Sequence, residues 1–181
     1  MFEIRDDAAG LRVSLTREPA PRDPRLVEDS LFQIATWDAG GLGDPHDWPT
    51  REAFMAAMSP EHTAIFAVVR VESPDGPYLV SAGREASDIA GYAFATHERL
   101  CLHYGLEAIG PGNRAQVLEE AEYELLGELL AYEDYVGGHV FRYEVRDRWG
   151  RVLETRRDLY GEDYARHLAQ EAFDRHLVGV G

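Results

Sequence analysis

The sequence predicts an α+β protein, with a mainly antiparallel sheet and with a long acidic helix and a C-terminal helix packed on it. Two patterns support this fold class. Short segments that alternate apolar and polar residues, separated by turns rich in Gly, Pro and Asp, are typical of antiparallel strands. Apolar residues three and four positions apart indicate helices. The length of 181 residues is that of one ordinary domain, so residues 1–181 are expected to form a single domain.

The first third of the chain predicts a hairpin and one further strand. Residues 2–5 and 11–16 alternate around a Gly-ended turn, which indicates the hairpin. Residues 17–25 contain three prolines and are expected to be irregular. Residues 31–37 read as a strand with one buried face, and 38–49 as a long loop of Gly, Asp and Pro.

The middle of the chain predicts three strands and two short helices. Thr50 is a plausible N-cap for a helix over 51–58. Residues 63–72 form an almost continuous apolar run, whereas an edge strand with one exposed face would alternate apolar and polar residues. They therefore predict a central strand. Residues 78–82 should pair back on this strand. A further strand is expected over 89–96, followed by a helix over 97–104 that Gly105 ends.

The last third of the chain predicts two helices around a hairpin. Apolar residues recur at helical spacing over 113–135, and Gly137-Gly138 ends this long helix. Strands over 139–147 and 151–157 should form the hairpin. A final amphipathic helix is expected over 162–177.

Net charge is the strongest feature of the composition. The chain has 33 acidic and 18 basic residues, a formal net charge of −15, and every basic residue is Arg. Such a chain repels nucleic acid and anionic membranes and attracts basic surfaces, so we expect neither direct nucleic-acid binding nor membrane binding. A GC-rich genome explains the absence of Lys equally well, and a halotolerant host explains the acidity.

Two observations bear on the compartment. The lone Cys101 excludes an internal disulfide and favours a reducing environment. The first seven residues carry charges where a signal peptide needs an apolar run, and no run of 18 apolar residues occurs. These features predict a cytoplasmic protein.

The long helix is the first candidate site. Its carboxylates occur with no Arg between Arg114 and Arg142, and some repeat at every fourth position, which costs roughly 0.2 to 0.5 kcal/mol per like-charged pair. One interpretation is a ladder that imitates nucleic-acid phosphates or docks a basic partner. The alternative is a solvated face in an acidic proteome. The candidate partner-binding residues are Glu119, Glu120, Glu124, Glu128, Glu133 and Asp134.

Arginines crowd the hairpin that follows the acidic helix. They include Arg142, Arg146, Arg148, Arg151, Arg156 and Arg157. Their guanidinium groups are expected to meet helix carboxylates, either within one molecule or across a homo-oligomer. A nucleic-acid site is the alternative, although no aromatic-interleaved binding module is recognisable.

The Gly/Pro-rich loop is the second candidate site. Asp38, Asp44 and His46 supply carboxylate and imidazole groups that suit a divalent metal. Their spacing matches no EF-hand, HExxH or zinc knuckle, and Asp and His also cap turns. No P-loop, GxGxxG or GxSxG motif is present either. We therefore predict no cofactor and no catalytic residue, and keep these three residues as weak metal candidates.

Residues 132–141 (Tyr-Glu-Asp-Tyr-Val-Gly-Gly-His-Val-Phe) resemble the hallmark segment of an uncharacterised protein family. Phages, plasmids and integrative elements of Gram-positive bacteria carry that family. Its Gly-aromatic strand, its Gly-Asp-x-His stretch and its terminal Phe-Tyr-Gly resemble residues 91–95, 43–46 and 159–161 here. Its Trp-Asp-Ser-Gly and Cys-Trp segments are replaced by 86–90 and Arg156-Arg157. The resemblance implies a mobile-element setting and no assigned activity.

The sequence thus favours a non-enzymatic accessory protein of a phage or mobile element that binds a basic host protein through an acidic surface. The specific case is an anti-defence inhibitor of the anti-CRISPR or anti-restriction type, acting on a nucleic-acid-binding defence protein by nucleic-acid mimicry. Two alternatives stay open. One is a metal-dependent enzyme that uses the Asp38, Asp44 and His46 loop, and the other is a structural domain that assembles with copies of itself.

Overall fold

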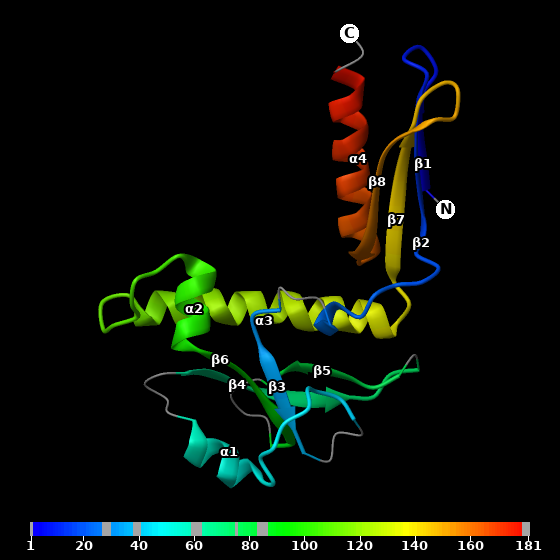
Figure 1. Ribbon diagram of the computed structural model, residues 1–181. Coiled ribbons are helices and arrows are strands. Elements are labelled where there is room, and N and C mark those ends of the chain that lie inside the picture. Colours follow the sequence, from blue (N-terminus) through cyan, green and yellow to red (C-terminus); the bar gives the residue numbers. More distant parts are fainter. Residues whose placement is uncertain are drawn as a thin grey trace. The chain divides into compact units, whose positions relative to one another are not determined.

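The computed structural model describes residues 2–26, 30–37, 41–58, 63–74, 76–82 and 87–178 (Figure 1). These residues form four α-helices and two antiparallel four-stranded sheets, which confirms the predicted α+β class. The C-terminal helix packs on a sheet, also as predicted. Among the described helices, none combines the length and the apolar character needed to cross a bilayer.

The chain divides into two compact units. Unit 1 combines Met1–Asp23 with Asp134–Gly181, and unit 2 is Pro24–Glu133. The N-terminal hairpin therefore belongs with the C-terminal third of the chain, a pairing that no local pattern indicates. The expectation that residues 1–181 fold as a single domain stays a prediction.

Unit 1 is a sheet of order β1-β2-β7-β8 covered on one face by α4. Its elements are β1 (Phe2–Asp6), β2 (Leu11–Arg17), β7 (Val140–Arg146), β8 (Val152–Tyr160) and α4 (Glu162–Val178). In β2 the residues alternate between the two faces, so that Val13 is fully buried whereas Arg12 is exposed. Alanines at 165, 169 and 172 form the buried stripe of α4 and bring the helix close to the sheet. The opposite face of this sheet carries Arg12 of β2 paired with Arg146 of β7, and Arg142 four residues before Arg146 on the same strand.

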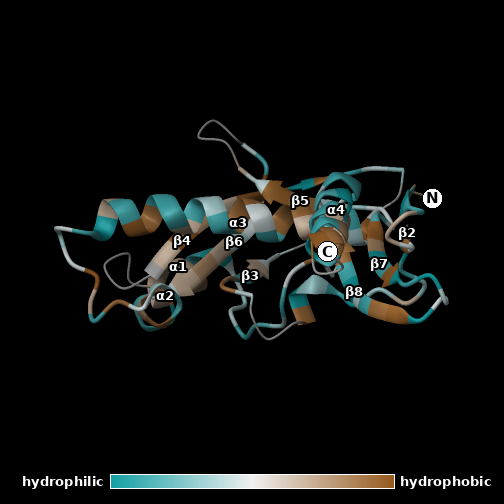
Figure 2. Cartoon of the chain, turned by 90° about the horizontal axis from the view of Figure 1, so that it is seen from above, coloured by the Kyte–Doolittle hydropathy of each residue, from teal (hydrophilic) through white to brown (hydrophobic). Residues whose placement is uncertain are grey.

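Unit 2 is a sheet of order β3-β6-β4-β5 with α3 packed against it. Its strands are β3 (Gln33–Thr36), β4 (Thr63–Val71), β5 (Tyr78–Ser81) and β6 (Ile89–Thr96). Its helices are the 3-10 helix Pro24–Leu26, α1 (Arg51–Ala57), α2 (His97–Tyr104) and most of α3 (Arg114–Val136). β4 is central, as its continuous apolar run predicts. Val117, Ala121, Leu125 and Leu129 are the buried residues of α3, and Figure 2 shows apolar and polar residues alternating along this helix.

A buried carboxylate stabilises the end of β2 in unit 1. The side chain of Glu18 is fully buried and accepts two hydrogen bonds from Arg157, at 2.6 Å from Nη2 and 3.0 Å from Nε. The amide of Ala20 donates a third at 3.3 Å. The hydrogen bond from Arg157 lowers the pKa of Glu18, and burial opposes it only in part. The ionised carboxylate is therefore the form that the fold prefers.

This arrangement predicts the pH dependence of unit 1. A carboxyl group whose folded pKa is lowered contributes stability above its unfolded pKa and loses it as pH falls through the folded pKa. Glu18→Gln should cost about 1 to 2 kcal/mol at pH 7 and should flatten the loss of stability in acid. Hydrogen exchange of the β7 amides from pH 7 to pH 3 measures both effects. Glu171→Gln on exposed α4 is the control, and parallel curves for wild type and Glu18→Gln would contradict the prediction.

Candidate functional site

The side of α3 that faces solvent carries four exposed carboxylates. Glu119, Glu120, Glu122 and Glu124 alternate with the buried residues at 117, 121 and 125. Glu120 accepts a hydrogen bond of 2.8 Å from Gln116. Within the described ranges, none of the four forms an ion pair. No described basic side chain neutralises their charge through an ion pair.

An apolar stripe accompanies these carboxylates. Tyr123, Leu126 and Leu130 are 79%, 43% and 59% exposed, and they follow one another at spacings of three and four residues. Glu119 precedes Tyr123 by one turn, while Glu122 lies on one side of the stripe and Glu124 on the other. An apolar strip between carboxylates is typical of a binding surface. We call this surface the α3 outer face and define it by Glu119, Glu120, Glu122, Tyr123, Glu124, Leu126 and Leu130.

Glu128 lies apart from this face, although the sequence places it in the same ladder. Successive i+4 positions rotate by about 40° around a helix of 3.6 residues per turn, which carries Glu128 toward the core. Its carboxylate is half-buried and accepts hydrogen bonds from the hydroxyl of Ser30 at 2.6 Å and the amide of Leu31 at 2.5 Å. Burial raises the pKa of Glu128, and these hydrogen bonds oppose the rise in part. Glu128 thus anchors the segment that enters β3.

Glu133 and Asp134 are also half-buried. Burial raises the pKa of Tyr78, and a hydrogen bond to Glu133 raises it further. Asp134 lies 3.8 Å from Nδ1 of His139 and, through its backbone carbonyl, accepts a hydrogen bond of 2.7 Å from the amide of that histidine. Of the six candidate partner-binding residues, the α3 outer face brings together Glu119, Glu120 and Glu124.

The metal candidates of the loop act as partners of a sheet edge. β3 is an edge strand, and Asp44 completes it by donating its amide to the carbonyl of Ile34 at 2.8 Å and accepting the amide of Ile34 at 2.7 Å. The same carboxylate oxygen lies 2.6 Å from Arg25. Nε2 of His46 bonds to the carbonyl of Thr36 at 3.0 Å. Asp44 and His46 therefore satisfy backbone groups, while Asp38 lies outside the described residues.

His46 is held in an aromatic cluster. Its ring lies 5.1 Å from that of Trp37 and 5.6 Å from that of Trp48. Nδ1, the other ring nitrogen of His46, is buried and has no hydrogen-bond partner among the described residues. A pocket of about 350 Å³ lies beside the ring, lined by Gln33, Asp47 and Phe94 among others. In the described part of the chain, no group of three or more metal-binding side chains is found.

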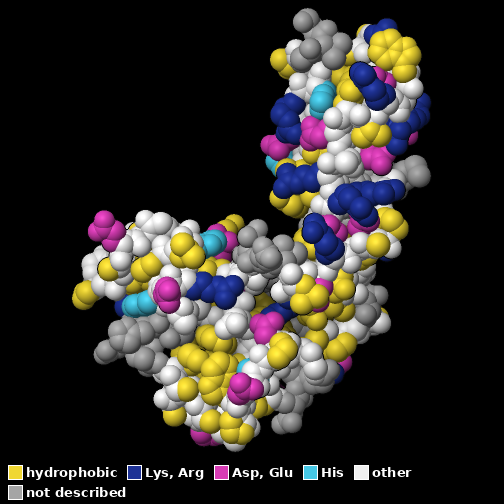
Figure 3. All heavy atoms as spheres, in the orientation of Figure 1, with side chains coloured by type: hydrophobic (Ala, Val, Ile, Leu, Met, Phe, Trp, Pro, Cys, Tyr) yellow, Lys and Arg dark blue, Asp and Glu magenta, His cyan; other side chains and the backbone are white. Residues whose placement is uncertain are grey.

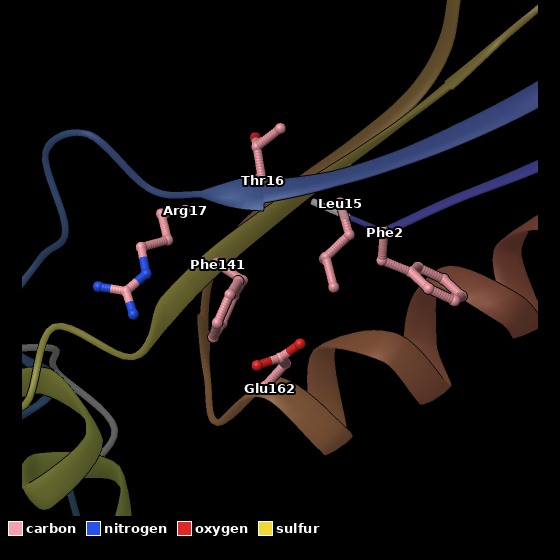
Figure 4. A pocket seen from close by; sticks show the side chains of 6 residues that line it. All are labelled: Phe2, Leu15, Thr16, Arg17, Phe141 and Glu162. Carbon is pink, nitrogen blue, oxygen red and sulfur yellow. The ribbon is translucent and has the colours of Figure 1, made fainter.

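A second pocket belongs to unit 1 (Figure 4). Its volume is about 330 Å³, and Phe2, Leu15 and Phe141 form its apolar wall. Arg17 and Glu162 lie at its two polar sides, and Glu162 is bound to Arg166 at 2.5 Å. No motif in the sequence indicates this pocket.

Acidic and basic residues are divided unequally between the units. Unit 2 has 19 acidic residues and six arginines, a formal net charge of −13, whereas unit 1 has 14 acidic residues and 12 arginines. Basic side chains gather over the β7, β8 and α4 region in Figure 3. Two of the hairpin arginines form ion pairs within unit 1: Arg146 binds Glu144 at 2.5 Å, and Arg157 binds Glu18.

These features define an α+β protein of two sheet-and-helix units with an acidic, apolar-centred helix face. Comparison with protein-family models, with curated proteins and with solved structures gives no match for this chain. The resemblance of residues 132–141 to the mobile-element family stays a prediction.

Sequence reasoning missed the apolar part of the site. Tyr123, Leu126 and Leu130 lie off the core stripe of α3, and this is visible in the sequence once the buried positions 117, 121, 125 and 129 are fixed. The exposed Trp149 lies between the two strands of the predicted hairpin, 139–147 and 151–157, where no binding residue is predicted. In both places the signal is a large apolar residue where the pattern requires a polar one.

Proposed function

We propose that this protein is a non-enzymatic binding protein that docks a basic partner protein on the α3 outer face. The observation that carries the proposal is the exposed stripe of Tyr123, Leu126 and Leu130 between carboxylates that have no ion-pair partner among the described residues. A face that serves only solubility needs no such stripe. Binding surfaces combine an apolar centre rich in aromatic residues with a polar rim.

The charges and shape of the face specify the partner. Carboxylates bind guanidinium groups in bidentate pairs, so Arg-rich surfaces suit the rim. The apolar stripe suits a ridge of aliphatic or aromatic side chains between those basic groups. The net charge of −13 on unit 2 adds long-range attraction, which raises the association rate with a basic protein.

The finer proposal concerns the partner's identity. We propose a nucleic-acid-binding defence protein of a bacterial host, blocked by a protein that a phage or mobile element encodes. Two features support this choice: the carboxylates offer negative charge where a basic groove expects phosphate, and residues 132–141 resemble a family carried by mobile elements. The site that binds nucleic acid in the partner would then be the site that binds α3.

Neutralising the α3 outer face should abolish binding. We expect Glu119→Gln, Glu120→Gln and Glu124→Gln together to weaken the complex at least about tenfold, because three charge-assisted contacts are lost. The measurement is capture from a Gram-positive host lysate on immobilised protein, at about 0.05 M and 0.5 M salt, which brackets strong and weak screening. A basic protein retained at low salt by wild type alone is the expected result.

Three exposed acids of α4 supply the matched control. Asp163→Asn, Glu171→Gln and Asp174→Asn remove the same charge from unit 1, and this variant should retain the partner. Once the partner is purified, wild-type protein should displace a labelled DNA duplex from it. Equal retention by the α3 variant would remove the binding proposal, whereas retention without DNA displacement would remove only the proposal of nucleic-acid mimicry.

A further inference from the structure

The turn between β7 and β8 presents a tryptophan to solvent. Trp149 is 80% exposed, whereas Trp37 and Trp48 pack around Phe54 in an aromatic cluster. Tryptophan and arginine are the residues that most often dominate the energy of protein interfaces. Trp149 makes no contribution to a core cluster of unit 1, so its apolar surface is available to a binding partner.

The backbone holds this turn in one shape. Oδ1 of Asp147 accepts the amides of Trp149 at 3.0 Å and Arg151 at 2.9 Å, and the carbonyl of Asp147 accepts the amide of Gly150 at 3.0 Å. Gly150 has the positive φ of 80° that such a hairpin turn requires. The guanidinium of Arg148 lies 5.5 Å from the centre of the Trp149 ring. A turn that is ordered in advance loses little entropy when it binds.

Apolar and basic residues alternate along this turn and the start of β8. Val152 and Leu153 are 42% and 37% exposed, and the side chain of Arg151 is 76% exposed while its Nε lies 3.2 Å from Asp147. We call this surface the β7–β8 tip and define it by Arg148, Trp149, Arg151, Val152 and Leu153. It offers exposed apolar side chains beside two guanidinium groups, of which that of Arg151 is paired with Asp147, whereas the α3 outer face offers apolar side chains beside carboxylates.

We propose that the β7–β8 tip of one copy docks on the α3 outer face of a second copy. Trp149 would cover the stripe from Tyr123 to Leu130, which extends about 10 Å along the helix. Hairpin strands lie about 5 Å apart, so the tip is narrow enough to place its arginines beside the flanking glutamates. The arginines and the tryptophan of the tip would thus meet the glutamates and the apolar stripe of the face, so one chain carries both complementary surfaces.

The contact is heterologous, because a tip meets a face and not another tip. In a pair, one copy therefore keeps an unoccupied face and the other keeps an unoccupied tip, and each of these can bind a further copy. Such assemblies either close into a ring or grow longer as the protein concentration rises. The second copy occupies the face that serves the basic partner in the proposed function, so self-association and partner binding exclude one another.

Two complementary variants test the inference. The tip variant carries Arg148→Ala, Trp149→Ala and Arg151→Ala, and the face variant carries Glu119→Gln, Glu120→Gln, Tyr123→Ala and Glu124→Gln. Sedimentation velocity should show wild type associating with concentration, with the dissociation constant at least about tenfold higher for each variant alone. An equimolar mixture should form a one-to-one complex, because it retains one intact tip and one intact face. Tyr164→Ala, at an aromatic residue of α4 that is 52% exposed, should associate like wild type.

Each remaining outcome overturns the inference. The first is a wild-type protein that stays monomeric up to about 1 mM, a concentration that corresponds to a binding free energy of only about −4 kcal/mol. The second is a tip variant or a face variant that associates like wild type. The third is a mixture of the two variants that forms no complex. Circular dichroism confirms that each variant is folded. The tip variant should bind the basic partner with undiminished affinity, so loss of self-association in that variant is distinguishable from failure of the proposed function.

Discussion

Alanine at position 91 is expected to destabilise unit 2 by about 3 kcal/mol or more, as overpacking a rigid site does. Gly91 of β6 is paired with Thr36 of β3 and Val68 of β4. A Cβ there would lie 2.1 Å from the carbonyl oxygen of Ala35 and 2.9 Å from Cα of Thr36. Both atoms belong to the backbone of β3, so the strand itself would have to move. Urea unfolding followed by tryptophan fluorescence, which reports Trp37 beside β3, measures the loss.

The same added methyl group should have the opposite effect at Gly127. This glycine is in the middle of α3, and a Cβ there would meet no atom within 4 Å. Gly127→Ala should therefore stabilise the protein by up to about 1 kcal/mol, because alanine favours the helix. A Gly91→Ala variant as stable as wild type would show that β3 does not pair with β6 as described.

Replacing Glu128 by alanine should cost about 2 kcal/mol, because the amide of Leu31 and the hydroxyl of Ser30 lose their acceptor in a half-buried setting. Glu128→Gln should cost less. Its amide oxygen keeps an acceptor in place, and the raised pKa of Glu128 shows that burial disfavours the charge. Urea unfolding gives the free energies, and hydrogen exchange of the Leu31 amide localises the change.

Glu124→Ala is the matched control for Glu128→Ala. Glu124 is exposed one turn earlier on α3, so its loss should change stability by less than about 0.5 kcal/mol. The two glutamates should also differ in binding, with Glu124 contributing to the partner contact. If Glu128→Ala left stability unchanged and abolished partner binding, Glu128 would belong to the binding face and its role as an anchor of β3 would be wrong.

Local patterns in the sequence predict most of the elements and few of their pairings. The helix expected over 113–135 is α3, Arg114–Val136, because its apolar period and the glycines at 137 and 138 are local signals. The pairing of β2 with β7 joins Val13 to Val145, and alternation within either strand carries no information about the other. For this reason the division into two sheets, with the N-terminal hairpin joined to the C-terminal hairpin, is not apparent from the sequence.

The sequence predicts the candidate site only for the side chains whose exposure to solvent can be deduced from the 3.6-residue period of α3. Glu119, Glu120 and Glu124 are exposed to solvent, while Glu128, four residues after Glu124, is half-buried and accepts the amide of Leu31. The Gly-Asp-Pro-His segment illustrates a second limit. Asp44 and His46 are residue types that bind metals, but here both side chains form hydrogen bonds with the backbone of β3 at the edge of the sheet. Only the tertiary structure shows that these backbone groups lie within reach.

The unequal charge of the two units has a consequence for how the protein meets other molecules. Screening at physiological ionic strength limits electrostatic attraction to about 8 Å, so a cationic surface responds to the nearest part of the protein and not to its total charge. Unit 2 attracts such a surface strongly, and unit 1, almost neutral, hardly does. A cationic molecule that diffuses close to unit 2 is therefore attracted and stays near it longer. One that diffuses close to unit 1 is not attracted and moves away again.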